Sequence, residues 1–298
     1  MDLKQLRTFM HVADLGSLSR AAERLHLSQP ALSRQIKLLE EEVGEALLKR
    51  TGRGVEITEA GQVLAGRASR ILSEMERLHA DMADYKGRIR GQVVLGLPPS
   101  AGLFVGGPLV ERYRTNYPEV KIRVVQMMSG NVQDALLEGK LDLGIIYEGS
   151  TTRPLRLDRL WAEKLYLVGN PNSGVVKGKP VSFEQICRYP LVISAPRHGV
   201  RNILERQAFK SEAILNIAVE SDSLSMILEL TRRGLGVSVL PLVACQEDLD
   251  KGSLIAAPIE KPKLERISSL AWARDFPLSP AAAAMADMIG EFAGQRLK

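Results

Sequence analysis

Apolar residues recur at helical spacing in three short stretches at the start of the chain. The first stretch ends at Gly16, and either Ser17 or Ser19 can cap the second. The third begins at Ser28, a capping residue, and has Pro30 in its first turn, where a missing backbone N–H costs little. The pattern therefore predicts three short helices before Gly44.

The third predicted helix has an apolar face and a polar face. The inward stripe is Leu32, Ile36, Leu39 and Val43. The opposite face carries Gln29, Ser33, Arg34 and Lys37. Residues 47–58 then predict a strand, a basic Gly-rich turn and a second strand. Helices followed by a basic hairpin are typical of a winged helix-turn-helix, whose third helix enters the major groove of DNA.

Several side chains of this block have the chemistry for DNA contact. Arg34 can form paired hydrogen bonds with guanine, Gln29 can hydrogen-bond adenine, and Lys37 can bind a phosphate. The net charge of +5 and the pI near 9.2 are compatible with such a partner without requiring it, so a merely solvated polar surface stays an alternative. The predicted DNA contacts are Ser28, Gln29, Pro30, Ser33, Arg34, Lys37, Arg50 and Arg53.

Residues 59–87 contain no proline and predict one long helix. Its apolar residues alternate at spacings of four and three, as in a coiled coil, and are Leu64, Ala68, Ile71, Met75, Leu78, Met82 and Tyr85. Because a helix this long cannot bury such a stripe against the small head alone, we expect it to pair with a second copy. Packing on the C-terminal part of the same chain is the alternative. Residues 59–90 are thus interpreted as a dimerising linker.

From residue 91 onward, apolar runs alternate with helical patterns, which predicts an α/β fold with a mostly parallel sheet. Because this part of the chain is large for one such sheet, two lobes are expected. The expected strands are Gln92–Leu97, Lys121–Met127, Leu141–Ile146, Leu165–Gly169, Leu191–Ser194, Ile217–Glu220, Gly236–Leu240 and Ser268–Ala273. The expected helices are Leu103–Asn116, Val132–Glu138, Arg201–Phe209, Leu224–Arg233 and Pro280–Ala293.

Over its first 61 residues the chain strongly resembles the LysR-type transcriptional regulators. The matching runs are Leu3–Phe9, Gly16–Leu25, Leu27–Glu40, Leu47–Arg50 and Val55–Gly61. Leu48 stands where the family commonly has Phe, a conservative apolar change. Further along, residues 138–145 and 233–241 match the family in pattern.

The resemblance implies a winged helix-turn-helix domain over residues 1–58 and an effector-binding domain over 91–298. The latter would resemble a periplasmic binding protein, with lobe I at about 91–161 and 267–298 and lobe II at about 162–266. It also implies a homodimer, commonly assembled into a tetramer, that binds double-stranded DNA and a small-molecule effector. RNA polymerase is a possible further partner.

Loops that follow strands and open helices favour anionic ligands. Three such loops begin near Ser100, Ser129 and Ser194, and the third carries Arg197, His198 and Arg201 within five residues. The resemblance implies that Ser100, Ser129 and this third loop line the effector pocket. Tyr147 is a further candidate. We expect a small anionic or polar effector, although Arg197 and Arg201 could instead pair with the protein's own carboxylates, such as Glu205 or Glu220.

No enzyme class is favoured, since the four histidines lack metal-ligand spacing and nucleotide-binding or nucleophile-elbow motifs are missing from the sequence. No cofactor or metal is predicted. Cys187 and Cys245 are expected to be reduced thiols, and we expect a cytoplasmic protein because neither a signal peptide nor an apolar span of membrane length is present. The predicted function is a LysR-type, effector-controlled transcriptional regulator. The alternative is a solute-binding protein with an appended nucleic-acid-binding head.

Overall fold

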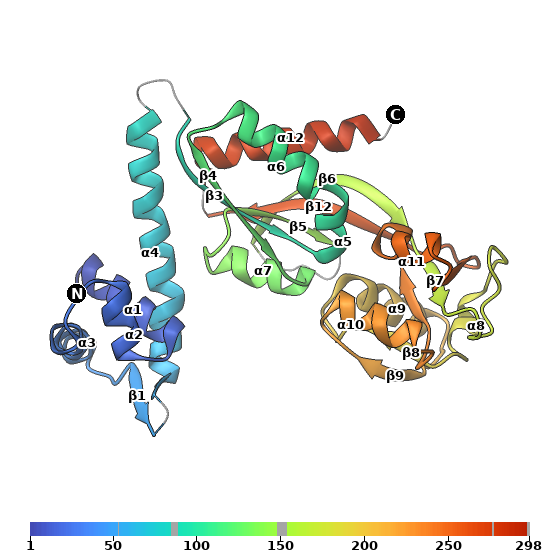
Figure 1. Cartoon of the computed structure of the whole chain (residues 1–298), viewed down its shortest axis with the longest axis horizontal. Helices are drawn as coiled ribbons and strands as arrows, with labels where there is room; N and C mark the ends of the chain where they lie inside the picture. Colours follow the sequence, from blue (N-terminus) through green and yellow to red (C-terminus); the bar gives the residue numbers. More distant parts are fainter. Residues whose placement is uncertain (53, 85–88, 148–153, 276, 297–298) are drawn as a thin grey trace. The chain divides into compact units, whose positions relative to one another are not determined.

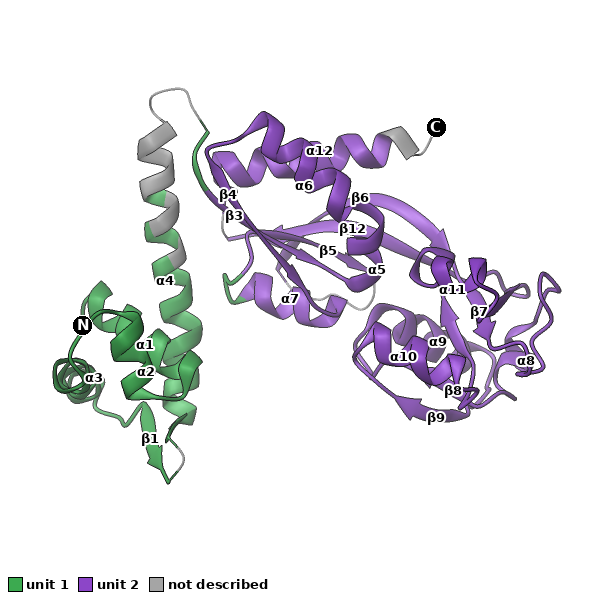
Figure 2. Ribbon diagram, viewed as in Figure 1, with its two compact units in different colours: residues 1–91, 138–140 green, residues 92–137, 141–298 purple. Residues whose placement is uncertain are grey.

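The computed structural model describes residues 1–52, 54–84, 89–147, 154–275 and 277–296. It divides into two compact units (Figure 2): residues 1–91 with 138–140 form unit 1, and residues 92–137 with 141–298 form unit 2.

Unit 1 begins with three helices whose ends the sequence anticipates. They are α1 (Leu3–Leu15), α2 (Leu18–Arg24) and α3 (Gln29–Val43). Ser17 and Ser28 cap α2 and α3, and Gly16 ends α1 in the left-handed conformation. The antiparallel hairpin of β1 (Leu48–Thr51) and β2 (Gly54–Ile57) and the long helix α4 (Glu59–Asp84) complete the unit. This order confirms the predicted winged helix-turn-helix and linker helix.

The core of unit 1 joins the three short helices to the hairpin and to the first part of α4. Phe9, Leu32, Leu39 and Leu47 are fully buried in it. Val43, which the spacing placed on the inward stripe, is 39% exposed, since it is the last residue of α3 and lies beyond the core. That part of the prediction was wrong.

One five-stranded sheet organises the first lobe of unit 2. Its order is β4-β3-β5-β12-β6. Helices α6 and α12 lie along one side of the sheet and α7 along the other (Figure 1). The strands are β3 (Gly91–Leu97), β4 (Val120–Gln126), β5 (Leu143–Tyr147), β6 (Leu155–Lys164) and β12 (Glu265–Ala273); the helices are α5 (Pro99–Ala101), a π-helix η1 (Gly102–Gly106), α6 (Gly107–Asn116), α7 (Ser129–Leu137) and α12 (Pro280–Arg296).

This sheet is mixed rather than mostly parallel, which corrects the prediction. Strands β3 and β5 are parallel, but β12 returns from the second lobe and runs antiparallel to both β5 and β6. Strand β6 was not predicted at all, because exposed charged residues such as Arg156, Asp158 and Arg159 break its apolar pattern. The short strand β11 was missed as well.

The second lobe contains the sheet β10-β7-β11 and the parallel pair β8-β9. Strand β6 leads into β7 and β11 leads into β12, so two adjacent segments cross between the lobes. Leu165 N donates to Leu264 O at 2.9 Å at this crossing. The elements are β7 (Tyr166–Gly169), α8 (Phe183–Ile186), β8 (Leu191–Ile193), α9 (Gly199–Lys210), β9 (Ile217–Glu220), α10 (Leu224–Arg232), β10 (Ser238–Leu240), η2 (Leu242–Ala244), α11 (Gln246–Asp250) and β11 (Ile255–Pro258).

Candidate functional sites

The polar face of α3 is uncovered within unit 1. Gln29, Arg34 and Lys37 are exposed, while Ser33 is half-buried and lies 3.5 Å from the Gln29 amide nitrogen. Within the described part of the chain, Arg34 takes part in no ion pair and no side-chain hydrogen bond. Lys37 meets Glu41 at 3.6 Å, a solvated contact one helical turn apart.

A surface groove of about 340 Å³ connects this face with the wing. Ser33, Arg34 and Lys37 of α3 border it together with Arg50 of β1. Ser28 and Pro30 lie in the first turn of α3, where the Ser28 hydroxyl accepts from Ala31 N at 3.4 Å. Arg53 lies outside the described residues. The structure thus brings α3 and wing residues from the predicted set together on one surface.

The predicted helix seam on α4 divides into two parts. Leu64 and Ala68 pack into the core of unit 1. Farther along, Ile71 is 43% and Leu78 is 52% exposed, and Met75 between them is half-buried. The side chain of Met82 and all of Tyr85 are outside the described residues. The uncovered apolar stripe therefore starts near Ile71, not at Leu64.

A cavity of about 60 Å³ lies between the two lobes of unit 2. Segments after β3, β4 and β8 and the last residue of β5 line it, together with α10, β10 and the crossing strand β12. Five of the seven predicted effector residues contribute to its wall: Ser100, Ser129, Tyr147, Ser194 and His198.

Arg201 and Arg197 do not line that cavity. Arg201 is buried, and its guanidinium binds Glu205 and Glu220, each at 2.6 Å, which is the alternative that the sequence left open. Arg197, in the loop after β8, instead binds Asn131 at 2.8 Å and forms an ion pair with Asp134. Because both partners belong to α7, Arg197 joins lobe II to lobe I.

His198 is 2% exposed and immediately precedes α9. Its Nε2 lies 3.1 Å from the Asp222 carboxylate. Burial, helped by the nearby Arg197 cation, lowers the pKa of the His198 imidazole despite the opposing effect of the Asp222 carboxylate, which favours the neutral ring. Next to it, Gly199 N donates to the Ser129 hydroxyl at 3.3 Å, a second link between the lobes.

Arg266, on β12, is a cavity residue that the sequence reasoning missed. It is 3% exposed, and its guanidinium carbon lies 3.9 Å from the centre of the Tyr147 ring. Its Nε donates to Glu163 at 2.8 Å and its Nη2 donates to Ser100 at 3.0 Å. The Ser100 hydroxyl also bonds the Tyr147 hydroxyl at 2.7 Å, and burial raises the pKa of Tyr147.

The sequence does contain a signal for Arg266. It directly precedes the mostly apolar run Ile267–Ala273, so the strand can be extended to include it. The predicted strand began at Ser268, however, so Arg266 was placed outside it. The structure begins this strand at Glu265 and pairs Arg266 with Glu163 of β6 across the ladder.

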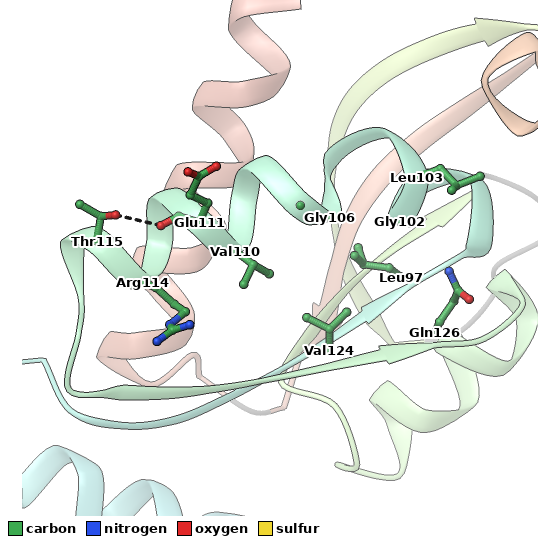
Figure 3. A pocket seen from close by; sticks show the side chains of 11 residues that line it. Leu97, Gly102, Leu103, Gly106, Val110, Glu111, Arg114, Thr115, Val124 and Gln126 are labelled. Carbon is green, nitrogen blue, oxygen red and sulfur yellow. Dashed lines mark hydrogen bonds between the residues drawn. The ribbon is translucent and has the colours of Figure 1, made fainter. Parts of the chain in front are cut away.

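A larger, open groove of about 860 Å³ lies on lobe I (Figure 3). Val110 of α6 and Val124 of β4 face each other across it, and Glu111, Arg114 and Gln126 lie at its border (Figure 3). It contains none of the predicted site residues. Its wall is built from one lobe only, in contrast to the cavity around Arg266.

Comparison with known proteins matches both units. Residues 3–62 match the family model for the bacterial regulatory helix-turn-helix protein of the lysR family, and residues 86–294 match the LysR substrate binding domain. The nitrogen assimilation regulatory protein nac of Klebsiella aerogenes is 32% identical over 290 residues, covering 97% of this chain and 94% of that protein.

Solved structures agree with the fold. Full-length OxyR from Pseudomonas aeruginosa, in a variant form, has a TM-score of 0.70 at 25% identity, covering 97% of this chain and 94% of that one. Full-length CbnR in complex with its target DNA has a TM-score of 0.69 at 22% identity, covering 98% and 99%. Among the helices of the described residues, none is long and apolar enough to cross a lipid bilayer.

Proposed function

The chain belongs to the LysR family of DNA-binding transcriptional regulators, and from this premise we propose that α3 and the wing read a specific operator while a small effector binds between the lobes of unit 2. The observation that carries the DNA-binding part is the exposed polar face of α3. Arg34 projects from it without an ion pair to any described residue, and Arg50 of the wing borders the same groove. The major groove, about 12 Å wide, accepts one helix.

The proposed assembly is a homodimer, extended to a homotetramer on the family pattern. The support lies on α4, where Ile71 and Leu78 expose an apolar stripe that continues beyond the core of unit 1. A second copy of the helix would cover this stripe with complementary apolar side chains. Two heads held in this way would read two half-sites of one operator.

The proposed effector is small and anionic or polar. The hydroxyls of Ser100, Ser129 and Ser194 surround a cavity that both lobes build. Arg197 and Gly199 of lobe II reach α7 of lobe I, so these contacts form only when the lobes are close. An effector acts on DNA binding only through its difference in affinity for the two arrangements of the regulator.

The decisive experiment compares Arg34→Ala with Lys37→Ala on an operator selected from random duplexes by the full-length protein. Arg34→Ala is expected to cost about 1–3 kcal/mol on that operator and to relax base preference at one position. Lys37→Ala should weaken all sequences alike and reduce the salt dependence by about one phosphate contact. An equal loss for Arg34→Ala on operator and random DNA would contradict base reading by Arg34.

A further inference from the structure

The interlobe cavity contains one cation whose hydrogen-bonding capacity is only partly used. A guanidinium has five N–H donors. Within the described part of the chain, Arg266 uses its Nε toward Glu163 and its Nη2 toward Ser100, and no hydrogen bond is made by Nη1. Since Arg266 lines the cavity, the remaining donors belong to a group that a ligand can approach.

The lobe II wall of the same cavity is mostly apolar, with Ser194 and His198 as its polar members. Lobe II contributes Val192, Ile227, Val239, Leu240 and Ala244 to it. These side chains offer no polar atoms, so a ligand held between the two walls gains most when one end is charged and the rest is hydrocarbon. The cavity is thus divided between a cationic end at the crossing strands and an apolar end in lobe II.

Resting on the proposed regulator function, we infer that the effector is a small carboxylate with an apolar carbon skeleton, and that Arg266 binds its carboxylate group. Planar guanidinium and carboxylate groups form paired charge-assisted hydrogen bonds. The Ser100 hydroxyl, 3.0 Å from Nη2, lies beside that position and is a further donor. The skeleton lies against Ile227, Val239 and their neighbours.

Three observations assign this role to Arg266 rather than to the arginines of the 194–201 loop. Arg201 already has two carboxylate partners, Arg197 is paired with Asp134, and neither lines the cavity. Glu163 offsets the charge of Arg266, yet of the Arg266 donors only Nε hydrogen-bonds to it. Arg266 is therefore the cation in this wall with donors still available.

The size of the space sets how the ligand is accommodated. At about 60 Å³ the inner cavity is far below the roughly 300–1,000 Å³ of typical ligand pockets. A second space of about 360 Å³ shares Pro99, Met128 and Leu224 with it and is lined from both lobes. The carboxylate end then occupies the inner cavity, and the lobes separate slightly as the skeleton extends toward this outer space.

The test uses the full-length protein and titration calorimetry with three probes, butanoate, hexanoate and benzoate, each beside its neutral amide. At least one acid is expected to bind wild type about tenfold or more tightly than its amide. The double variant Arg266→Gln/Glu163→Gln should remove this preference without leaving an unpaired buried carboxylate. Arg232→Gln is the matched control, because Arg232 pairs with Asp248 outside the cavity and its loss should leave the preference intact.

Two results would overturn the inference: an acid preference that survives in the double variant, or a wild type that binds none of the three acids more tightly than its amide. Operator binding is measured on the same preparations. If the acid preference is missing while wild type still selects and binds its operator, only the carboxylate assignment fails. If operator selection is also missing, the proposed function fails with it.

Discussion

Arg34 in unit 1 is the arginine proposed to contact DNA and Arg266 in unit 2 is the one inferred to bind the effector, and their surroundings are opposite. Arg34 is exposed and makes no ion pair with any described residue, whereas Arg266 is 3% exposed and bonds both Glu163 and Ser100. On a surface that binds DNA, the hydrogen-bond donors are exposed to water in the free protein. A cavity for a small molecule must hold its donors in place beforehand, so they need partners within the protein.

This difference also decides what a substitution does. Removing an exposed, unpaired side chain changes binding and leaves folding nearly untouched. Removing one member of a buried pair leaves the other charge without a partner, so folding itself is weakened. The two regions can therefore be separated by measuring stability and binding on the same variants.

The largest effect is expected for Arg266→Gln, which should lower the free energy of unfolding by about 3 kcal/mol because Glu163 stays buried without its cation. Arg34→Gln should change it by less than about 0.5 kcal/mol. Both tryptophans, Trp161 and Trp272, belong to unit 2, so urea unfolding followed by fluorescence reports on the first variant. Unfolding of the Arg34→Gln variant is followed by circular dichroism. Equal free energies of unfolding for Arg266→Gln and Arg34→Gln would contradict this difference between the two sites.

Leu78→Lys is expected to dissociate the proposed homodimer, because it places a charge in the apolar seam of α4. Light scattering on the full-length protein measures the mass, and the helical content should be unchanged. Val63→Lys is the control, since Val63 is 68% exposed on the same helix but off the seam. An unchanged mass for Leu78→Lys would mean that the stripe is not a helix-pairing surface.

The link between lobes made by Arg197 and Asp134 should be worth less than about 1 kcal/mol, since their side chains are 52% and 34% exposed. A double-mutant cycle with Arg197→Ala and Asp134→Asn, followed by tryptophan fluorescence during unfolding, measures the coupling. Operator affinity without effector should stay at the wild-type value in all three variants. Strictly additive effects would show that the pair does not hold the lobes together in solution.

The smallest effect concerns pH. Burial lowers the pKa of His198 in the folded protein below its ordinary 6.5, so the unfolded chain binds more protons as pH falls through that range. The stability of unit 2 that depends on neutral His198 is therefore present above about pH 6.5 and is lost progressively below it. His198→Gln should flatten this decline in the fluorescence transition. The control variant His11→Gln, in unit 1, should leave the decline in the stability of unit 2 unchanged.

The head was predictable because its signals are local. Ser17, Ser28 and Gly16 mark helix ends within a few residues of the helices they cap, and the polar face of α3 follows from a spacing of three and four. The prediction that Val43 is buried was wrong because spacing alone does not show where a core ends. In unit 2 most strands were predictable from apolar runs, whereas β6 was not, because its exposed charged residues hide a strand that β12 holds in the sheet.

The amino-acid sequence by itself determined the helices of the head, the wing, the long helix after it and the loops that approach the cleft, since each depends on neighbours along the chain. The tertiary structure alone decided which polar groups meet at the cavity: Ser100, Tyr147 and Arg266 line it, and Glu163 binds Arg266 where two strands cross. It also turned Arg201 toward Glu205 and Glu220 and linked Arg197 to α7. Which buried charges pair depends on which groups folding brings close together, and neither composition nor residue spacing gives that information.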